Sequence, residues 1–339
     1  MATIKDVAKL AGVSISTISR VLNAPDKVTK EKRERVLRAI EQLKYHPNAL
    51  ARGLIHKKTK TLGILIPDIS NYYYAEMFRG MEDAAQEFGH NIIICNTDKD
   101  KQRMISALRS MKEKQIDGFV FTSEPVYPDY YDIFNQLGMP VVLASTQSLE
   151  YAIPSVKIDD EQAGFDAAQY LIDCGHRRIA MISGPHLDPI AGMSRLQGFM
   201  RAMRTNELDF DSARCVEFGN YRYDDGYAAM ERLWNKNPEL TALFAASDEM
   251  ALGAIYFLYR SGIRVPDQVS VLGLDNTRIA SMSLPRLTTV AQPIYEIGYK
   301  AVRTLQEVLD GAGPPTLRTY LPHQIVTRDT VKNVNGEIF

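Results

Sequence analysis

The segment at residues 3–22, TIKDVAKLAGVSISTISRVL, constrains the fold of this chain more than any other segment. Its apolar residues recur at the spacing of one helical face on both sides of Gly12, which predicts two short helices joined by a turn. Ser14 is placed to cap the second helix. The outward face of that helix carries Ser16, Thr17 and Arg20. A helix-turn-helix unit places its second helix in a DNA groove, so we expect this face to reach base edges.

The charge of the N-terminal region supports the same interpretation. A third helix is predicted after Thr29, which can cap it, with a buried side formed by Val36, Ile40 and Leu43. Basic side chains crowd this helix: Lys30, Lys32, Arg33, Arg35 and Arg38. Residues 1–60 contain 14 Lys and Arg against 5 Asp and Glu, whereas residues 61–339 contain 26 against 36. A basic head on an acidic body indicates a phosphate-binding surface, and the alternative is a helical subdomain with a solvated basic face.

From residue 61 onward, short apolar runs alternate with helical stretches. The first series has strands at 62–67, 91–95, 118–122 and 140–145, with helices at 74–88, 101–114 and 130–137. The second has strands at 179–183, 215–218, 242–247 and 269–275, with helices at 195–205, 224–236, 249–261 and 294–309. We expect the chain to cross between two parallel-sheet halves near 158–161, 290–293 and 322–324. Ligands bind at the carboxyl ends of strands in such sheets, so a cleft between the halves is the predicted ligand site.

Nine motifs along the chain point to one known family. They are TIKDVAKLAGVSISTISRVLN, YHPNALARGL, LGILIPDISNYYYAE, QIDGFVF, CGHRRIAMISGP, RLQGFMRAM, SDEMALGAI, VSVLGLDNT and LPRLTTVAQP. Through them the chain resembles the LacI/GalR family of bacterial transcription regulators from about residue 3 to residue 328. The resemblance implies an N-terminal all-α helix-turn-helix head plus an α/β periplasmic-binding-protein-like core of two doubly wound parallel-sheet subdomains.

The resemblance also implies a domain organisation. Residues 1–46 would form the DNA-binding domain and residues 47–60 a hinge helix and linker. The N-subdomain of the core would take residues 61–160 with crossover contributions from 292–322. The C-subdomain would take 161–290 with 323–330, which leaves 331–339 as a tail.

DNA contacts are assigned by the same resemblance to the head and the linker. Ile15 and Ser16 match the positions that choose the operator, and Thr17 supports backbone contact. Arg20 can donate to both major-groove acceptors of guanine. The assigned linker residues are Asn48, Ala51 and Leu54. Residues 48–54 are too few for a stable isolated helix. In the family this segment folds when two copies pack in the minor groove, where Leu54 matches a residue that wedges between base steps. A flexible tether to the core is the alternative.

An effector site in the cleft is implied at eight matching positions: Tyr73, Tyr74, Ser123, Arg195, Tyr221, Asp248, Asp275 and Gln292. Aromatic faces can stack on a sugar ring, arginine donates hydrogen bonds, and carboxylates accept them from hydroxyl groups. This mixture favours a small sugar-like effector. Tyr73 or Tyr74 could instead pack at a helix start, and Asp275 could cap a turn.

Within the family, a second resemblance is to catabolite control protein A, through IPSVKIDDEQAGFDAAQYLIDCGH, SDEMALGAI and QPIYEIG. The corepressor of that protein is seryl-phosphorylated HPr, and the matching surface includes Tyr295, Glu296 and Arg303. Glu296 replaces an aspartate, and Thr304 replaces a leucine. Tyr299 would fill the partner groove, and Glu307 would repel a phosphoserine. The sequence therefore favours a sugar-released repressor of carbohydrate metabolism, with an HPr-dependent regulator as the alternative.

Other classes of protein lack support in the sequence. We find no GxxxxGK[ST], GxSxG or strand-linked GxGxxG motif, so we expect neither an enzyme nor a cofactor. We expect Asp159, Asp160 and Glu161 to form a solvated turn. The three cysteines lack a CxxC pattern and the six histidines do not cluster, which predicts no metal site and a reducing, cytoplasmic, nucleoid-associated protein. No apolar stretch could span a membrane. The C-terminal residues have no leucine heptad, so we expect a homodimer on a pseudo-palindromic operator.

Overall fold

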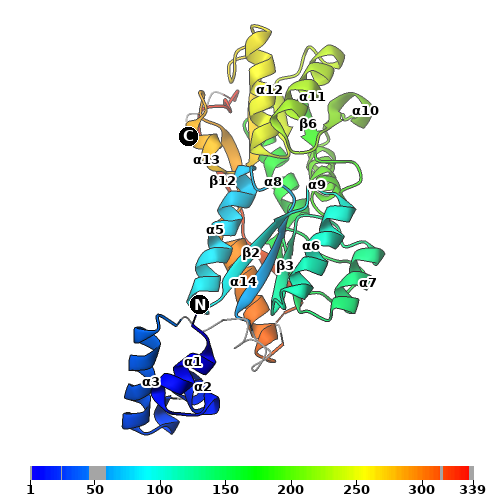
Figure 1. Cartoon of the computed structure of the whole chain (residues 1–339). Coiled ribbons are helices and arrows are strands. Elements are labelled where there is room, and N and C mark those ends of the chain that lie inside the picture. Colours follow the sequence, from blue (N-terminus) through cyan, green and yellow to red (C-terminus); the bar gives the residue numbers. More distant parts are fainter. Residues whose placement is uncertain (1, 24, 46–58, 314–315, 336–339) are drawn as a thin grey trace. The chain divides into compact units, whose positions relative to one another are not determined.

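The computed structural model describes residues 2–23, 25–45, 59–313 and 316–335 (Figure 1). The chain divides into two compact units, residues 1–59 and residues 60–339, which we refer to as the head and the core. Most of the predicted hinge, including Asn48, Ala51 and Leu54, lies outside the described residues.

The head contains the predicted helices. They are α1 Ile4–Ala11, α2 Ile15–Asn23, the 3-10 turn η1 Pro25–Lys27 and α3 Lys30–Gln42. Gly12 ends α1 at φ +62°, a left-handed conformation that glycine adopts without strain. The hydroxyl of Ser14 accepts from the backbone N–H of Thr17 at 3.2 Å, which confirms the predicted cap of α2. Thr29 precedes α3, but its side chain makes no capping hydrogen bond, so its predicted role is wrong.

A small apolar cluster holds the three helices of the head together. Val7, Ile18 and Val36 have no exposed surface, and one comes from each helix. Arg35, which we expected on the basic surface, has a structural role instead. Its guanidinium donates to the carbonyl of Ala11 at 2.6 Å and therefore satisfies an end of α1 that would otherwise lack a partner.

The first sheet of the core defines the N-lobe. Its strand order is β11–β5–β4–β3–β1–β2, and all neighbouring strands are parallel. The strands are β1 Thr61–Ile66, β2 Asn91–Asn96, β3 Gly118–Thr122, β4 Val141–Ala144, β5 Ser155–Ile158 and β11 Arg318–Leu321. Helices α5 Tyr72–Glu87 and α14 Ile294–Leu309 pack on one face, and α6 Lys101–Glu113 and α7 Pro128–Leu137 on the other (Figure 1). Because both faces are covered, β1 is a nearly continuous apolar run.

The second sheet defines the C-lobe, with the order β12–β10–β9–β8–β6–β7. Its neighbours are parallel except for the antiparallel edge pair β10–β12. The strands are β6 Ile179–Ser183, β7 Val216–Phe218, β8 Ala242–Ala245, β9 Ser270–Asp275, β10 Thr288–Ala291 and β12 Gln324–Val326. The helices are α8 Asp160–Asp173, α9 Gly192–Thr205, α10 Ser212–Cys215, α11 Tyr223–Lys236, α12 Asp248–Arg260 and α13 Arg278–Met282. The expected fold of two doubly wound sheets is confirmed.

The chain passes between the lobes at the predicted places. It leaves the N-lobe between β5 and α8, returns between β10 and α14, and leaves again between β11 and β12. The described part of the predicted tail packs on the C-lobe, because Val334 donates its backbone N–H to the carbonyl of Cys174 at 2.8 Å.

Candidate functional site

A cavity of about 420 Å³ lies between the two lobes, where strands of both sheets end. Seven of the eight predicted effector residues line it: Tyr73, Tyr74, Ser123, Arg195, Tyr221, Asp275 and Gln292. Ser123, Tyr221 and Asp275 have φ angles of +55°, +65° and +127°. Such conformations are unfavourable for residues with a side chain and persist where the surrounding structure holds them, often at functional sites.

Arg195 enters the cavity from α9 with three of its five N–H groups already used. Its Nε and one terminal nitrogen each lie 2.8 Å from Oδ1 of Asp160, and its other terminal nitrogen donates to the carbonyl of Ala246 at 2.7 Å. Two N–H groups of Arg195 therefore have no partner among the described residues and are available to a ligand.

The expectation that Asp160 lies in a solvated turn is wrong. Its side chain is 3% exposed, and its second oxygen lies 2.6 Å from Nζ of Lys157. Asp159 caps α8 by accepting from the N–H of Gln162, and this cap turns the next side chain into the protein. This burial could not be predicted from the sequence, because it depends on Arg195, which comes from α9, 35 residues away in the chain.

Aromatic and amide side chains form the wall on the N-lobe side. The hydroxyl of Tyr73 forms a hydrogen bond with Ser145 and lies 3.5 Å from Oε1 of Gln292. Burial raises the pKa values of both Tyr73 and Tyr74 well above their usual range, so both phenols stay neutral. These tyrosines pack at the start of α5, as the alternative interpretation held, and they also line the cavity.

Asp248 does not line the cavity, contrary to our expectation. It is 1% exposed, and its carboxylate accepts hydrogen bonds from the backbone and hydroxyl of Thr277 and from the hydroxyl of Thr289. Asp275 does reach the cavity, where it accepts from Gln292 at 2.8 Å. Burial and the neighbouring Asp248 raise the pKa of Asp275. Asp248 therefore lies behind the residues that line the cavity.

Sequence reasoning missed Asp188, which organises the loop before α9. One of its oxygens accepts from the hydroxyl of Tyr221 at 2.7 Å, and both accept from backbone N–H groups of residues 190–192. This arrangement fixes the ring of Tyr221, whose centroid lies 5.9 Å from the guanidinium carbon of Arg195. A single aspartate in a loop has no periodicity, so the sequence alone could not have identified it.

Polar contacts join the lobes at the mouth of the cavity. The amide of Asn71 donates to Glu249 at 2.9 Å, and Arg222 lies 3.4 Å from Asp68. Asn71 and Asp68 precede α5 in the N-lobe, whereas Arg222 and Glu249 belong to the C-lobe. A change in the angle between the lobes would break these contacts.

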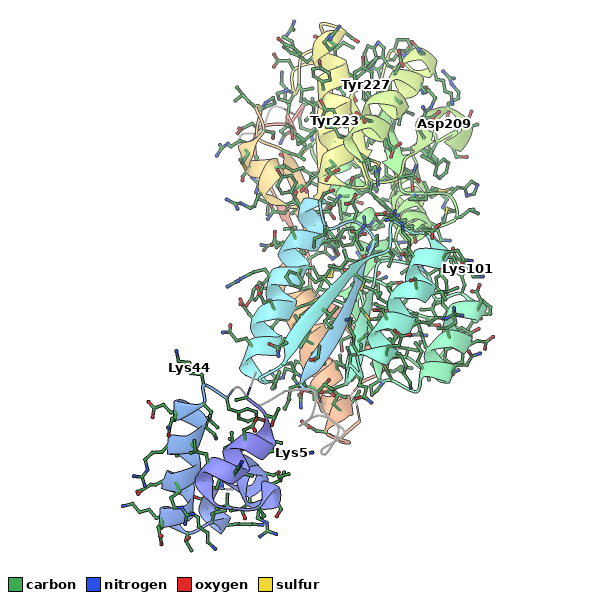
Figure 2. The ribbon with its side chains drawn as sticks, viewed as in Figure 1. Lys5, Lys44, Lys101, Asp209, Tyr223 and Tyr227 are labelled. Atoms are coloured by element: carbon green, nitrogen blue, oxygen red, sulfur yellow. The ribbon has the colours of Figure 1, made fainter. Side chains whose placement is uncertain are left out.

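The predicted DNA-reading face lies on α2. Ile15, Ser16 and Arg20 are exposed, and Thr17 is partly exposed. The hydroxyl of Ser14 lies 2.8 Å from that of Ser16 and 2.9 Å from that of Thr17. Exposed lysines such as Lys5 and Lys44 add positive charge to the head (Figure 2). The predicted DNA-contact residues that the structure describes therefore lie together on α2.

The region considered for a protein partner is occupied by contacts within the N-lobe. The hydroxyl of Tyr295 donates to Asp83 of α5 at 3.0 Å, and that of Tyr299 donates to Glu87. Arg303 lies 3.7 Å from Glu307, whereas Glu296 is exposed. Thr304 is 4% exposed and therefore faces the core of the lobe.

The described residues contain no group of three or more His, Cys, Asp or Glu side chains that could hold a metal ion. They also contain no helix that is both long enough and apolar enough to cross a membrane.

A helix-turn-helix head joined to a two-lobed core with a cavity at the strand ends defines the class of DNA-binding regulators that carry a ligand-binding core. Residues 3–48 match the family described as "Bacterial regulatory proteins, lacI family". Residues 59–328 match the family described as "Periplasmic binding proteins and sugar binding domain of LacI family". The chain belongs to the LacI family, whose members are transcription regulators rather than enzymes.

Similar proteins agree with this assignment over nearly the full length. Catabolite control protein A of Priestia megaterium is 43% identical over 330 residues, which cover 97% of this chain and 99% of the relative. The structure of a transcriptional regulator CelR–cellobiose complex is 32% identical with a TM-score of 0.75, and covers 97% of this chain and 100% of the other. The lac repressor dimer bound to operator is 25% identical with a TM-score of 0.87, and covers 98% and 99% of the two chains.

Proposed function

We propose that this chain is a repressor of carbohydrate-metabolism genes that leaves its operator when a small sugar binds between the lobes. The observation that carries the proposal is that Arg195, which keeps two N–H groups without a partner among the described residues, lines a cavity that also offers tyrosine faces and the acceptors of Asp275 and Gln292. Donors, acceptors and aromatic faces at one site match the hydroxyl groups and ring of a sugar. The similar CelR structure contains cellobiose, which makes cellobiose the first sugar to test.

An HPr-dependent regulator is the second candidate, because catabolite control protein A is a similar protein over the full length. The contacts on α14 argue against it. Arg303 is close to Glu307, and Tyr295 and Tyr299 are bonded to acidic residues of α5, so a phosphoseryl partner would meet negative charge there.

The arrangement proposed on DNA is a homodimer with one head in each half of a pseudo-palindromic operator. Arg20 would read guanine, Ile15 and Ser16 would choose the half-site, and Thr17 would contact the backbone. Asn48, Ala51 and Leu54 would complete the contact through a hinge that folds on DNA. The proposed domain boundaries are those expected from the sequence, at residues 46, 60, 160, 290, 322 and 330. The protein would act in the cytoplasm at the nucleoid.

Calorimetric titration of the full-length protein with cellobiose, glucose and seryl-phosphorylated HPr tests the proposal. We expect a sugar to bind and Arg195→Ala to weaken it at least about tenfold, since charged hydrogen bonds contribute about 1.5–3 kcal/mol. Binding of HPr without binding of any sugar would overturn this ranking. A DNA duplex selected by the protein from random sequences then serves to test Arg20→Ala, which should abolish specific binding and leave salt-sensitive binding.

A further inference from the structure

The buried group formed by Lys157, Asp160 and Arg195 spans the passage between the lobes. Lys157 belongs to β5 of the N-lobe, Arg195 to α9 of the C-lobe, and Asp160 begins α8 just after the first crossover. All three side chains are at most 8% exposed, and all three residues line the cavity. Each cation lies within 2.8 Å of the same carboxylate, Lys157 at one oxygen and Arg195 at the other.

A lysine and an arginine that converge on one point form a common site for phosphate or carboxylate groups, because both cations donate charge-assisted hydrogen bonds. In this chain the point of convergence is already filled by Asp160. Its carboxylate therefore occupies the place that an anionic group of a ligand would take.

The remainder of the cavity does not offer a replacement site for an anion. Apart from Lys157, Asp160 and Arg195, the described lining residues include six Asp or Glu and two Lys or Arg. Arg222 lies 3.4 Å from Asp68 at the mouth. Lys99, on the exposed rim, lies 5.7 Å above the ring of Tyr221. The inner part of the cavity therefore presents an arginine whose charge is shared with a carboxylate, the carboxyl group of Asp275, and neutral hydroxyl and amide groups.

We infer that Asp160 is a specificity-determining residue that makes the cavity select uncharged polyhydroxylated ligands and reject phosphorylated or carboxylated ones. The inference rests on the proposed function of the cavity. Asp160 also positions Arg195: by holding Nε and one terminal nitrogen, it directs the remaining N–H groups toward the ligand. Replacing Asp160 with asparagine keeps the shape of the side chain but leaves two buried cations without their shared anion.

Inorganic phosphate is a suitable probe, because it tests the anion site whatever the natural ligand is. Its affinity is measured by thermal unfolding of the full-length protein at constant ionic strength, in wild type, Asp160→Asn, Lys157→Met and the double variant. We expect the affinity to follow the net charge of the three side chains, highest in Asp160→Asn, intermediate in wild type and the double variant, and lowest in Lys157→Met. Asp160→Asn should bind phosphate at least about tenfold more tightly than wild type.

Asp173→Asn is the matched control, since it makes the same chemical change at an exposed position of the same helix. An equal response of Asp160→Asn and Asp173→Asn to phosphate would overturn the inference. If Asp160→Asn does not fold, the wild-type protein still decides the matter, because tighter binding of phosphorylated than of uncharged sugar by wild type contradicts the inference. This outcome differs from a failure of the proposed function, in which no sugar binds the wild-type protein.

A second measurement compares glucose with glucose 6-phosphate, and cellobiose with glucuronate, in wild type and Asp160→Asn. Wild type should reject the anionic compounds, and Asp160→Asn should lose that preference. Tighter binding of glucose 6-phosphate than of glucose by the wild-type protein would show that Asp160 does not exclude anions.

Discussion

At the scale of the residue, Asp248 gives the core a distinct dependence on pH. Three hydrogen bonds from Thr277 and Thr289 stabilise its charged form, yet burial is the larger effect and raises the pKa of Asp248 from its ordinary 3.8 to about 7. The folded protein thus holds a proton that the unfolded chain has already released between about pH 4 and pH 7. The contribution of Asp248 to stability therefore falls as the pH rises through that range.

Asp248→Asn should remove this loss. An asparagine can accept from Thr277 through its oxygen and donate to the hydroxyl of Thr289, so the hydrogen bonds persist. We expect the unfolding free energy of the variant, relative to that of wild type, to rise between pH 5 and pH 7.5 by up to about 1.4 kcal/mol per pH unit. The melting temperature of the variant should rise relative to wild type over the same range. Thermal unfolding followed by circular dichroism measures the difference. A constant offset between the two proteins across this range would refute the role of Asp248.

At the scale of the element, helix pairs of the core approach through glycines. A Cβ atom added at Gly164 of α8 would lie 2.1 Å from the carbonyl oxygen of Arg195, and one at Gly198 of α9 would lie 1.9 Å from that of Glu161. The pairs α5–α14 and α11–α12 show the same reciprocal arrangement, at Gly80 with Gly298 and at Gly226 with Gly253. The close approach of α8 and α9 sets the depth at which Arg195 enters the cavity.

Gly164→Ala should therefore affect both stability and ligand binding. The added methyl group forces the backbone of α9 away at Arg195, which we expect to cost about 3 kcal/mol of unfolding free energy and to weaken sugar binding. Gly89→Ala is the control, because φ is +70° there and no atom lies within 4 Å of the added carbon. That variant should lose about 1 kcal/mol and keep its sugar affinity. Denaturant unfolding and calorimetry measure both effects, and equal sugar affinities in the two variants would contradict this account.

Elements were predictable where a local pattern decides them. The run of residues 62–67 is apolar on both faces of a covered sheet, so it indicated β1 directly, and the lobe crossings followed from the order of strands and helices. Of the site, Arg195 and the tyrosines followed from their matching positions. The burial and the partners of three carboxylates could not be predicted, because they depend on residues that only the tertiary structure brings near. These carboxylates are Asp160, Asp188 and Asp248.

At the scale of the whole molecule, the described residues of the head and of the core form separate hydrophobic clusters, since the cluster around Val7, Ile18 and Val36 includes no described residue of the core. A fragment of residues 60–339 should fold and bind sugar with the affinity of the full-length protein free of DNA. It should not bind the operator, because the basic residues that neutralise phosphate belong to the head. Undiminished operator binding by this fragment would refute the assignment of the head.

The lobe contacts at Asn71–Glu249 and Asp68–Arg222 indicate how the cavity can influence the head, because a ligand that changes the angle between the lobes must break or strengthen them. Linkage then requires a reciprocal effect: saturating operator should weaken sugar binding by the same factor as saturating sugar weakens operator binding, about 5- to 150-fold. Calorimetry with sugar, in the presence of operator or of a scrambled duplex, gives the first factor, and operator titrations with and without sugar give the second. A factor of one in both experiments would mean that the cavity does not control the DNA-binding head.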